Sequence, residues 1–204
     1  MAESRLRRRC ARGAGQEWFA APLLQEYLAS AQTGSRLAIL DIGPARSANV
    51  DYLSRFRCRL GIADAMPELL ALNDDASAQS AESVLADMLP PDPFAGTDLI
   101  LCWDLLDYLS HQGIRQLASH LRGLGGPGTA LHALVAYGVS SMPAQPSGYL
   151  LDADGLRSCP TPPGGSVRRP PRHSSGELQR LMPQWRVERS VLLRNGLQEY
   201  LLRC

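Results

Sequence analysis

Lysine is absent from this chain of 204 residues, and all 21 of its basic residues are arginine. The absence excludes enzymes that form a Schiff base on a lysine, among them those that use pyridoxal phosphate, and it excludes P-loop nucleoside triphosphatases. Coding bias is the simplest source of an all-arginine composition. With 45% apolar and 20% charged residues, the chain otherwise has the composition of an ordinary globular protein.

Cysteine is sparse and widely spaced. No two cysteines form a C-x-x-C pair, and no histidine lies near one at ligand spacing, so we expect no metal site. The odd number of thiols fits a reduced, cytoplasmic protein better than a disulfide framework. The five are Cys10, Cys58, Cys102, Cys159 and Cys204.

Long apolar runs are also missing. No stretch approaches the ~20 apolar residues that span a bilayer. Glutamines and glutamates interrupt the apolar residues that follow the arginine-rich residues 1–12, so we expect neither an export signal nor a membrane contact. The net charge of +1 gives no overall attraction to nucleic acid. The charge is nevertheless uneven, because residues 60–154 carry twelve acids against two arginines and residues 155–194 carry eight arginines against two glutamates.

The apolar pattern alternates between strand and helix periods up to residue 137. Such alternation predicts a parallel sheet with helices on both faces. The expected strands are 37–43, 58–64, 83–89, 97–103 and 129–137, and the expected helices are 16–32, 46–56, 67–72 and 111–124.

Residues 139–173 differ from the rest because they hold seven prolines and four glycines. A loop of this length is a lid, a partner-binding segment or disorder. Ser174 and Glu177 then form the pattern of a capping box, which predicts a helix that ends at residue 181 or 182. Two strands, 185–193 and 197–203, follow and are joined by an Asn-Gly pair typical of a hairpin.

Several stretches, taken in order, resemble the class I S-adenosylmethionine-dependent methyltransferase superfamily over residues 35–204. The resemblance implies an α/β, Rossmann-like, doubly wound sheet of seven strands, mostly parallel with an antiparallel C-terminal strand. Residues 1–34 are then a basic arm and helix before a single domain that contains the loop 139–173. The stretches are 40–47, 61–70, 86–90, 98–106 and 125–128.

The resemblance implies S-adenosylmethionine as a small-molecule cofactor, bound beyond the carboxyl ends of the strands. Gly43 would let the backbone approach the cofactor because it has no Cβ. Asp64 would accept hydrogen bonds from the ribose hydroxyls, and Asp87 from the adenine amino group. Trp103 would pack beside the cofactor or simply in the core. The implied cofactor-binding residues are Asp41, Gly43, Asp64, Asp87, Met88 and Trp103.

The turn after the first strand departs from the family pattern. Only Gly43 remains of its glycines, since Ala45 and Ser47 stand in the other places, and Pro44 removes one N–H donor. Arg46 either clamps the carboxylate of the cofactor or occupies its place. These departures weaken cofactor binding without excluding it.

Catalytic residues are not marked by a clear motif. Asp104, Asp107 and His111 follow the strand 97–103, where substrate lies in this fold. A helix would place Asp107 and His111 on one face as an acid–base pair, but the pattern favours a solvated helix start, where an aspartate stabilises the dipole. His132, in an apolar strand, is expected to be a hydrogen-bonded core residue.

The sequence leaves two functions open. The first is methyl transfer to an unidentified small-molecule or protein substrate. The second is a catalytically inactive relative that acts as a binding or regulatory subunit, with the basic stretch 168–172 as its contact to a protein partner. A nicotinamide-dependent oxidoreductase is disfavoured by the acidic strand ends, which suit a pyrophosphate poorly. Methylation of nucleic-acid bases is not expected either, because Asp104-Leu105-Leu106 replaces the Asn/Asp-Pro-Pro-aromatic signature.

Overall fold

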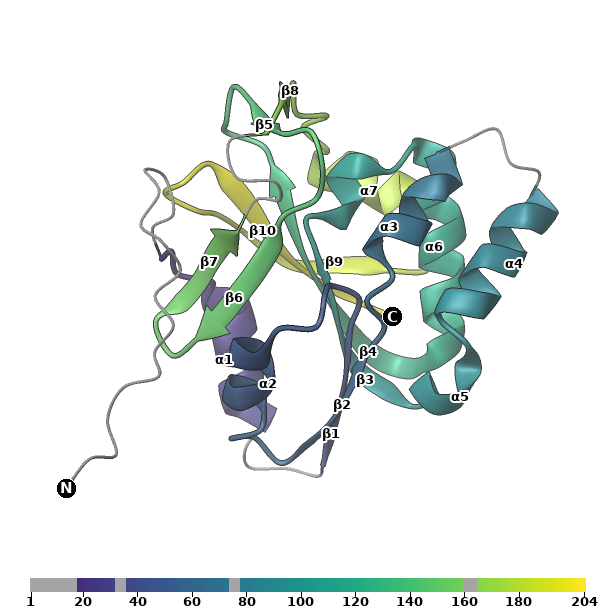
Figure 1. Ribbon diagram of the computed structural model, residues 1–204, viewed down its shortest axis with the longest axis vertical. Coiled ribbons are helices and arrows are strands. Elements are labelled where there is room, and N and C mark those ends of the chain that lie inside the picture. The colour runs from purple at the N-terminus through teal and green to yellow at the C-terminus, as the bar shows by residue number, and fades with distance from the viewer. Residues whose placement is uncertain (1–17, 32–35, 74–77, 160–164) are drawn as a thin grey trace.

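A six-stranded sheet lies at the centre of the molecule (Figure 1). This is a computed structural model that describes residues 18–31, 36–73, 78–159 and 165–204. The strand order is β2-β1-β3-β4-β10-β9. The strands are β1 (Leu37–Asp41), β2 (Cys58–Ile62), β3 (Thr97–Trp103), β4 (Gly125–Ala136), β9 (Arg186–Leu192) and β10 (Leu197–Arg203).

The strand directions confirm the α/β, Rossmann-like class expected from the sequence. Strands β2, β1, β3 and β4 run parallel to one another. Strand β10 is antiparallel to both of its neighbours, β4 and β9. The expected antiparallel C-terminal strand is therefore present, but the expected count of seven is wrong, because the described residues form six strands in this sheet.

The missing strand is the one predicted over residues 83–89. These residues lie in helix α4 (Ala78–Met88) and the position just after it. Ala81, Leu85 and Leu89 are buried at a spacing of four, which is the period of a helix face. The sequence SVLADML contains enough apolar residues to resemble a short buried strand. A run this short does not distinguish the period of a helix from that of a strand.

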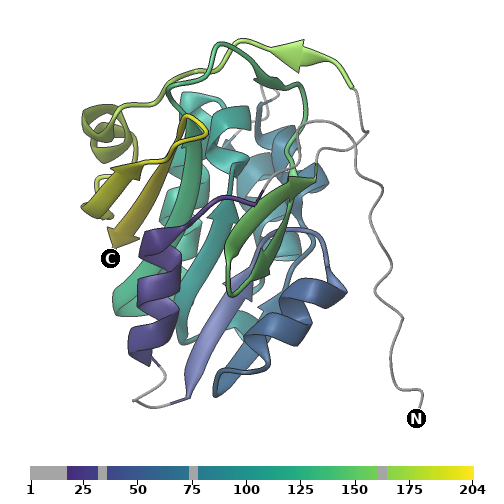
Figure 2. The same cartoon turned by 90° about the vertical axis from the view of Figure 1, so that its left-hand side faces the viewer.

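Helices cover the sheet on both sides. Figure 2 shows α1 and α2 side by side in front of it, and α3, α4, α6 and α7 lie on the opposite side in Figure 1. No described helix is long and apolar enough to cross a membrane. The other helices are α1 (Pro22–Ala31), α2 (Ser47–Leu53), α3 (Met66–Leu69), α5 (Pro91–Phe94), α6 (His111–Leu124) and α7 (Ser175–Leu181), with 3₁₀ turns η1 (Leu70–Asn73) and η2 (Leu105–Tyr108).

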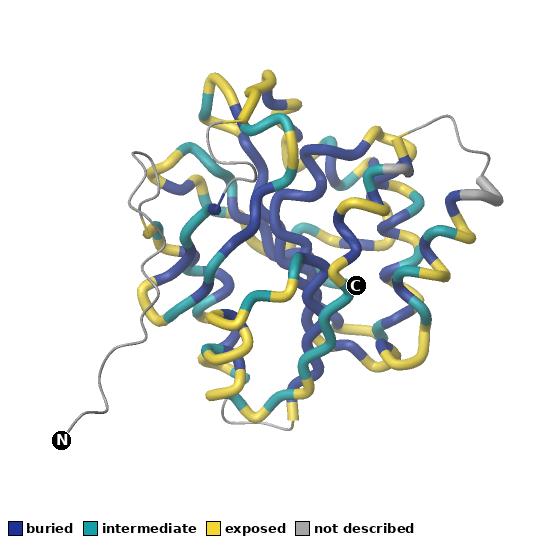
Figure 3. Tube along the Cα trace, viewed as in Figure 1, coloured by how far each residue is buried: buried dark blue, intermediate teal, exposed yellow. Residues whose placement is uncertain are grey.

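Local sequence signals explain several of these boundaries. Helix α6 has the predicted bounds, and its N-cap Ser110 accepts a hydrogen bond from the Gly113 amide. Ser174 likewise caps α7 by accepting from the Glu177 amide at 3.2 Å. The inner strands β1, β3, β4 and β10 are buried along most of their length (Figure 3), whereas the edge strands β2 and β9 contain no buried residue. Every residue of β1 is buried, as expected for a parallel strand that is covered on both faces.

The described part of segment 139–173 contains two small sheets. Strand β5 (Met142–Pro143) pairs with β8 (Val167–Arg168), and β6 (Gly148–Asp152) forms a hairpin with β7 (Gly155–Cys159). The side chain of Asn49 in α2 anchors this hairpin, because it donates to the Tyr149 carbonyl at 3.0 Å and accepts from the Leu151 amide at 2.9 Å. The hairpin is therefore held beside the turn that follows β1.

A buried carboxylate joins α1 to the sheet. Glu199 of β10 is fully buried, and its two oxygens accept hydrogen bonds from the Leu23 and Leu24 amides at 3.1 and 3.0 Å. The Nε2 atom of His132 in β4 lies 3.0 Å from the same carboxylate. His132 is thus the hydrogen-bonded core residue that the sequence predicted. The negative charge also lies at the N-terminus of a helix, where the dipole favours it.

Candidate functional site

The sheet has a topological switch point between β1 and β3. From β1 the chain goes to β2 on one side, and the next parallel strand, β3, lies on the other side of β1. In open α/β sheets, ligands bind outside the carboxyl ends of the strands at such a point. Asp41 ends β1 and Trp103 ends β3 at this edge. A ligand site is therefore expected at the turns that follow these two strands.

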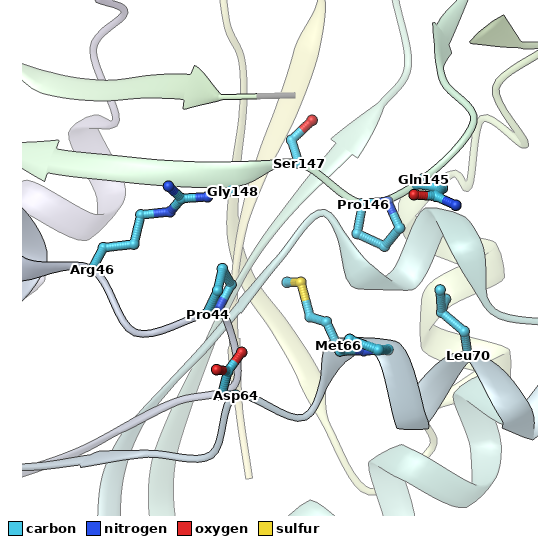
Figure 4. Close-up of a pocket in the computed structure, with 10 residues that line it drawn as sticks. Pro44, Arg46, Asp64, Met66, Leu70, Gln145, Pro146, Ser147 and Gly148 are labelled. Atoms are coloured by element: carbon cyan, nitrogen blue, oxygen red, sulfur yellow. The ribbon is translucent and has the colours of Figure 1, made fainter. Parts of the chain in front are cut away.

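A pocket of about 400 Å³ opens at this edge, and we call it the first-turn pocket (Figure 4). Its volume lies within the range typical of small-molecule sites. One wall comes from the turns after β1 and β2, and the other comes from residues 145–148, which lead into β6. The first wall consists of Pro44, Arg46, Asp64, Met66, Pro67 and Leu70.

Asp64 offers the first-turn pocket an uncommitted carboxylate. The residue follows β2 in a left-handed conformation with φ of 48° and is exposed. Among the described residues, no hydrogen bond or ion pair engages its side chain. Met66 and Leu70 add an apolar surface beside it. This wall can accept hydroxyl hydrogen bonds and pack against a flat ring.

Arg46 contributes a cation to the same pocket. Its guanidinium rests against Gly148, where a Cβ would overlap the terminal nitrogen. The Nε atom is buried and has no hydrogen-bond partner among the described residues. Arg46 therefore forms part of the wall of the pocket and brings a positive charge to it.

The turn after β1 is filled by protein. Asp41 is buried, and its Oδ1 accepts hydrogen bonds from the Gly43 amide at 2.9 Å and from Trp103 Nε1 at 2.6 Å. A Cβ on Gly43 would lie 2.7 Å from Trp103 Nε1. The missing Cβ of Gly43 thus makes room for the Trp103 indole. Asp41, Gly43 and Trp103 meet as the sequence suggested, but none of them lines the first-turn pocket.

Burial raises the pKa of Asp41 to about 6, and the hydrogen bonds from Trp103 and Gly43 oppose this rise. The Trp103 indole also stacks on Tyr149, with ring centroids 5.5 Å apart and planes 10° apart. The long segment after β4 therefore reaches back over the turn that follows β1.

Asp104 lies beneath this stack. Its Oδ2 accepts hydrogen bonds from the Ser147 amide at 3.0 Å and the Tyr149 hydroxyl at 3.2 Å, whereas its buried Oδ1 has no partner. Burial raises the pKa of Asp104 to about 7. Asp107, in η2, accepts from the Ala136 amide at 2.7 Å, and burial raises its pKa to about 7 as well. Both groups therefore titrate near neutrality.

Asp104 and Asp107 face a second cavity of about 180 Å³, which we call the acid cavity. Tyr108 and Tyr149 line it too, and it shares Ser147 with the first-turn pocket. Two carboxyl groups that titrate near pH 7 can exchange a proton with a bound molecule. The sequence named both residues, although it predicted a solvated helix start rather than a buried pair.

His111 does not join them. Ser110 caps α6 and separates it from η2, so Asp107 and His111 are not on one continuous helix. The Nε2 atom of His111 lies 3.2 Å from Glu177 of α7 instead. The predicted acid–base pair of Asp107 and His111 is therefore absent.

Asp87 and Met88 are also apart from the site. Both lie at the end of α4, and Asp87 is exposed. Neither residue lines the first-turn pocket or the acid cavity. Their predicted contact with adenine depended on the strand 83–89, which the structure replaces by a helix. Residues 145–148 were missed instead, because nothing in their sequence indicates what they pack against.

Three solved structures match most of this chain at low sequence identity. A 1,6-didemethyltoxoflavin-N1-methyltransferase of Burkholderia thailandensis, with S-adenosylhomocysteine bound, matches 89% of this chain and 76% of its own at 15% identity and a TM-score of 0.48. A glycopeptide N-methyltransferase, MtfA, complexed with S-adenosylmethionine, matches 88% of this chain and 92% of its own at 11% identity and a TM-score of 0.44. An S-adenosylmethionine-dependent methyltransferase of Methanosarcina mazei matches 91% and 98% at 11% identity and a TM-score of 0.43.

No family model and no curated protein sequence matches this chain.

Proposed function

We propose that this protein binds S-adenosylmethionine in the first-turn pocket and transfers its methyl group to a small-molecule or protein substrate. One observation carries the proposal: an exposed carboxylate, Asp64, and a guanidinium, Arg46, line the same pocket beyond the carboxyl ends of β1 and β2. The proposed ligand has a ribose diol for the carboxylate and an amino-acid carboxylate for the guanidinium. Its adenine suits the apolar surface of Met66 and Leu70.

The residues around the pocket have separate roles in this proposal. Asp64 holds the ribose, and Arg46 orients the amino-acid tail. When bound, the cofactor supplies a methyl group on a positively charged sulfur. Methyl transfer needs mainly in-line positioning, sometimes with a general base. Asp104 and Asp107 are placed to accept a proton from a substrate in the acid cavity, because their pKa values lie near 7.

Asp64→Ala should weaken binding of S-adenosylhomocysteine by ~1–3 kcal/mol, the usual scale for hydroxyl donors left without an acceptor. Titration calorimetry measures the change. Asp51→Ala is the matched control, because Asp51 is an exposed aspartate of α2 outside the pocket. Equal affinities of wild type and Asp64→Ala would rule out the assignment of Asp64 to the ribose.

Arg46→Gly should weaken binding of S-adenosylhomocysteine but leave binding of 5′-methylthioadenosine, which has no carboxylate, unchanged. Arg46 is the N-cap of α2, a position where glycine is well tolerated, so the helix should remain. Calorimetry with both ligands shows whether Arg46 holds the carboxylate of the ligand or occupies its place. Tighter binding of both ligands by the variant would mean that Arg46 obstructs the pocket.

A second candidate function is supported by the turn after β1. Trp103 fills the space over Gly43 and stacks on Tyr149, which favours a relative that binds without catalysing methyl transfer. In that case a folded protein would bind neither ligand at millimolar concentration. The basic stretch 168–172 would then be tested for a protein partner, although Arg168 lies over the Tyr108 ring and Arg172 donates to the Val139 carbonyl.

A further inference from the structure

Two histidines and a glutamate converge at the N-terminal ends of α6 and α7. His111 Nε2 lies 3.2 Å from Glu177 Oε1, and His173 Nδ1 lies 3.5 Å from Glu177 Oε2. All three ligand atoms lie within 4.8 Å of one another. In the described part of the chain, this is the group of at least three histidine, cysteine, aspartate or glutamate side chains close enough to hold one metal ion. It lines neither cavity described above.

His173 is the least satisfied member of the group. Its side chain is 3% exposed, yet among the described residues neither ring nitrogen has a hydrogen-bond partner. A buried polar group without a partner costs about 1–3 kcal/mol. The Nδ1 atom lies 3.5 Å from Glu177 Oε2, and both atoms can donate an electron pair to a metal ion.

We propose that His111, His173 and Glu177 bind one divalent transition-metal ion of the zinc class. Two nitrogens and a carboxylate oxygen are a ligand set that zinc uses. Ligand atoms on a tetrahedral zinc lie about 3.4 Å apart, since each bond is about 2.1 Å. His111 Nε2 and His173 Nδ1 lie 3.2 and 3.5 Å from the two oxygens of the Glu177 carboxylate, so one ion can reach all three side chains. His111 is 56% exposed, so the fourth position faces solvent and takes water or an outside ligand.

The ion would connect two helices that the chain separates widely. His111 is the first residue of α6, directly after the segment that carries Asp104 and Asp107. His173 directly precedes the N-cap of α7, and Glu177 lies in the first turn of that helix. Bound metal would therefore stabilise the native state and hold the start of α6 against α7. The spacing of cysteines predicted no metal site, but His173 and Glu177 stand four residues apart, a signal that counting cysteines overlooks.

The test is titration of the whole protein, with its cysteines kept reduced, with zinc chloride by calorimetry. We expect one zinc ion per chain. His111→Gln and Glu177→Gln should each weaken binding at least tenfold, and both keep a polar side chain of similar size. His120→Gln is the matched control, because His120 lies on the same helix and contacts the Leu89 carbonyl instead. The control should bind zinc as tightly as the wild type.

Cobalt(II) provides a second measurement on the same variants. A site of two imidazoles and a carboxylate gives visible d–d bands without a near-ultraviolet thiolate charge-transfer band. Loss of those bands in His111→Gln would support the proposal. The absence of saturable zinc binding by the wild type, unchanged affinity in both variants, or a thiolate band would each overturn it.

Discussion

Replacing Glu199 by leucine should lower the free energy of unfolding by about 3–5 kcal/mol. The carboxylate accepts from the Leu23 and Leu24 amides and contacts His132 Nε2. Leucine would leave these groups buried without an acceptor, and each such loss costs about 1–3 kcal/mol. The first turn of α1 would also lose the negative charge that its dipole favours. Urea denaturation followed by circular dichroism measures the change.

The neighbouring strand offers a control for this experiment. Glu188 of β9 pairs with Arg203 at 2.9 Å, but both side chains are partly exposed. An exposed ion pair contributes about 0–1 kcal/mol, so Glu188→Leu should change stability little. Glu199→Gln should lie between the two, because its single amide oxygen can still accept a hydrogen bond. A loss below 1 kcal/mol for Glu199→Leu would contradict the assigned role of this carboxylate.

Raising the pH from 4 to 8 should destabilise the wild type, and Asp104→Asn should remove part of that loss. Burial raises the pKa of Asp104 from 3.8 to about 7. The folded state therefore binds more protons than the unfolded state between these two values. Protonated Asp104 therefore stabilises the folded state fully below the pKa that the carboxyl has in the unfolded chain. This stabilisation is lost as the pH rises through the higher pKa that the carboxyl has in the folded protein. A rise of about three units in the pKa corresponds to a loss of about 4 kcal/mol in the free energy of unfolding across this pH range.

The asparagine variant tests this directly. Its carbonyl oxygen can still accept from the Ser147 amide and the Tyr149 hydroxyl, while the charge is absent at every pH. Asp51→Asn, at an exposed position, should retain the full pH dependence. Asp107 and Asp41 shift in the same direction and keep their contributions in the variant. His173 acts in the opposite sense, because its lowered pKa favours the folded state as the pH rises.

The measurement is the free energy of unfolding of wild type, Asp104→Asn and Asp51→Asn in urea at steps from pH 4 to pH 8. Identical slopes for the wild type and Asp104→Asn would show that Asp104 titrates normally in the folded state. Such a result would also remove its proposed role as a proton acceptor near neutral pH.

Local signals in the sequence predicted most of the elements. The bounds of α6 follow from Ser110 at its N-cap and the glycines that end its apolar face. Strand β3 follows from an apolar run that parallel strands require. The hairpin of β9 and β10 follows from the Asn-Gly pair, where Gly196 adopts a φ of 83°. Each of these features depends on residues close together in the chain.

The residues of the candidate site were likewise predictable only where neighbours in the chain determine their position. Asp41, Asp64 and Asp104 lie at strand ends, so an apolar run followed by an acid was enough to name them. The strand predicted over 83–89 was wrong because a short apolar run has no reliable period, and Asp87 and Met88 were misplaced with it. Asp64 faces a pocket, whereas Asp41 is buried and hydrogen-bonded to Trp103. Which of the two occurs at a strand end depends on the side chains that other parts of the chain bring to it.

By itself, the sequence determined the α/β class, the parallel strands, the antiparallel C-terminal strand and the acids at the strand ends, because local periods and caps encode them. Tertiary structure alone decided that Trp103 covers Gly43 and stacks on Tyr149, that residues 145–148 form a pocket wall, and that His111 meets His173 and Glu177. These contacts join residues far apart in the chain. They depend on how whole elements pack, and no local period records that packing.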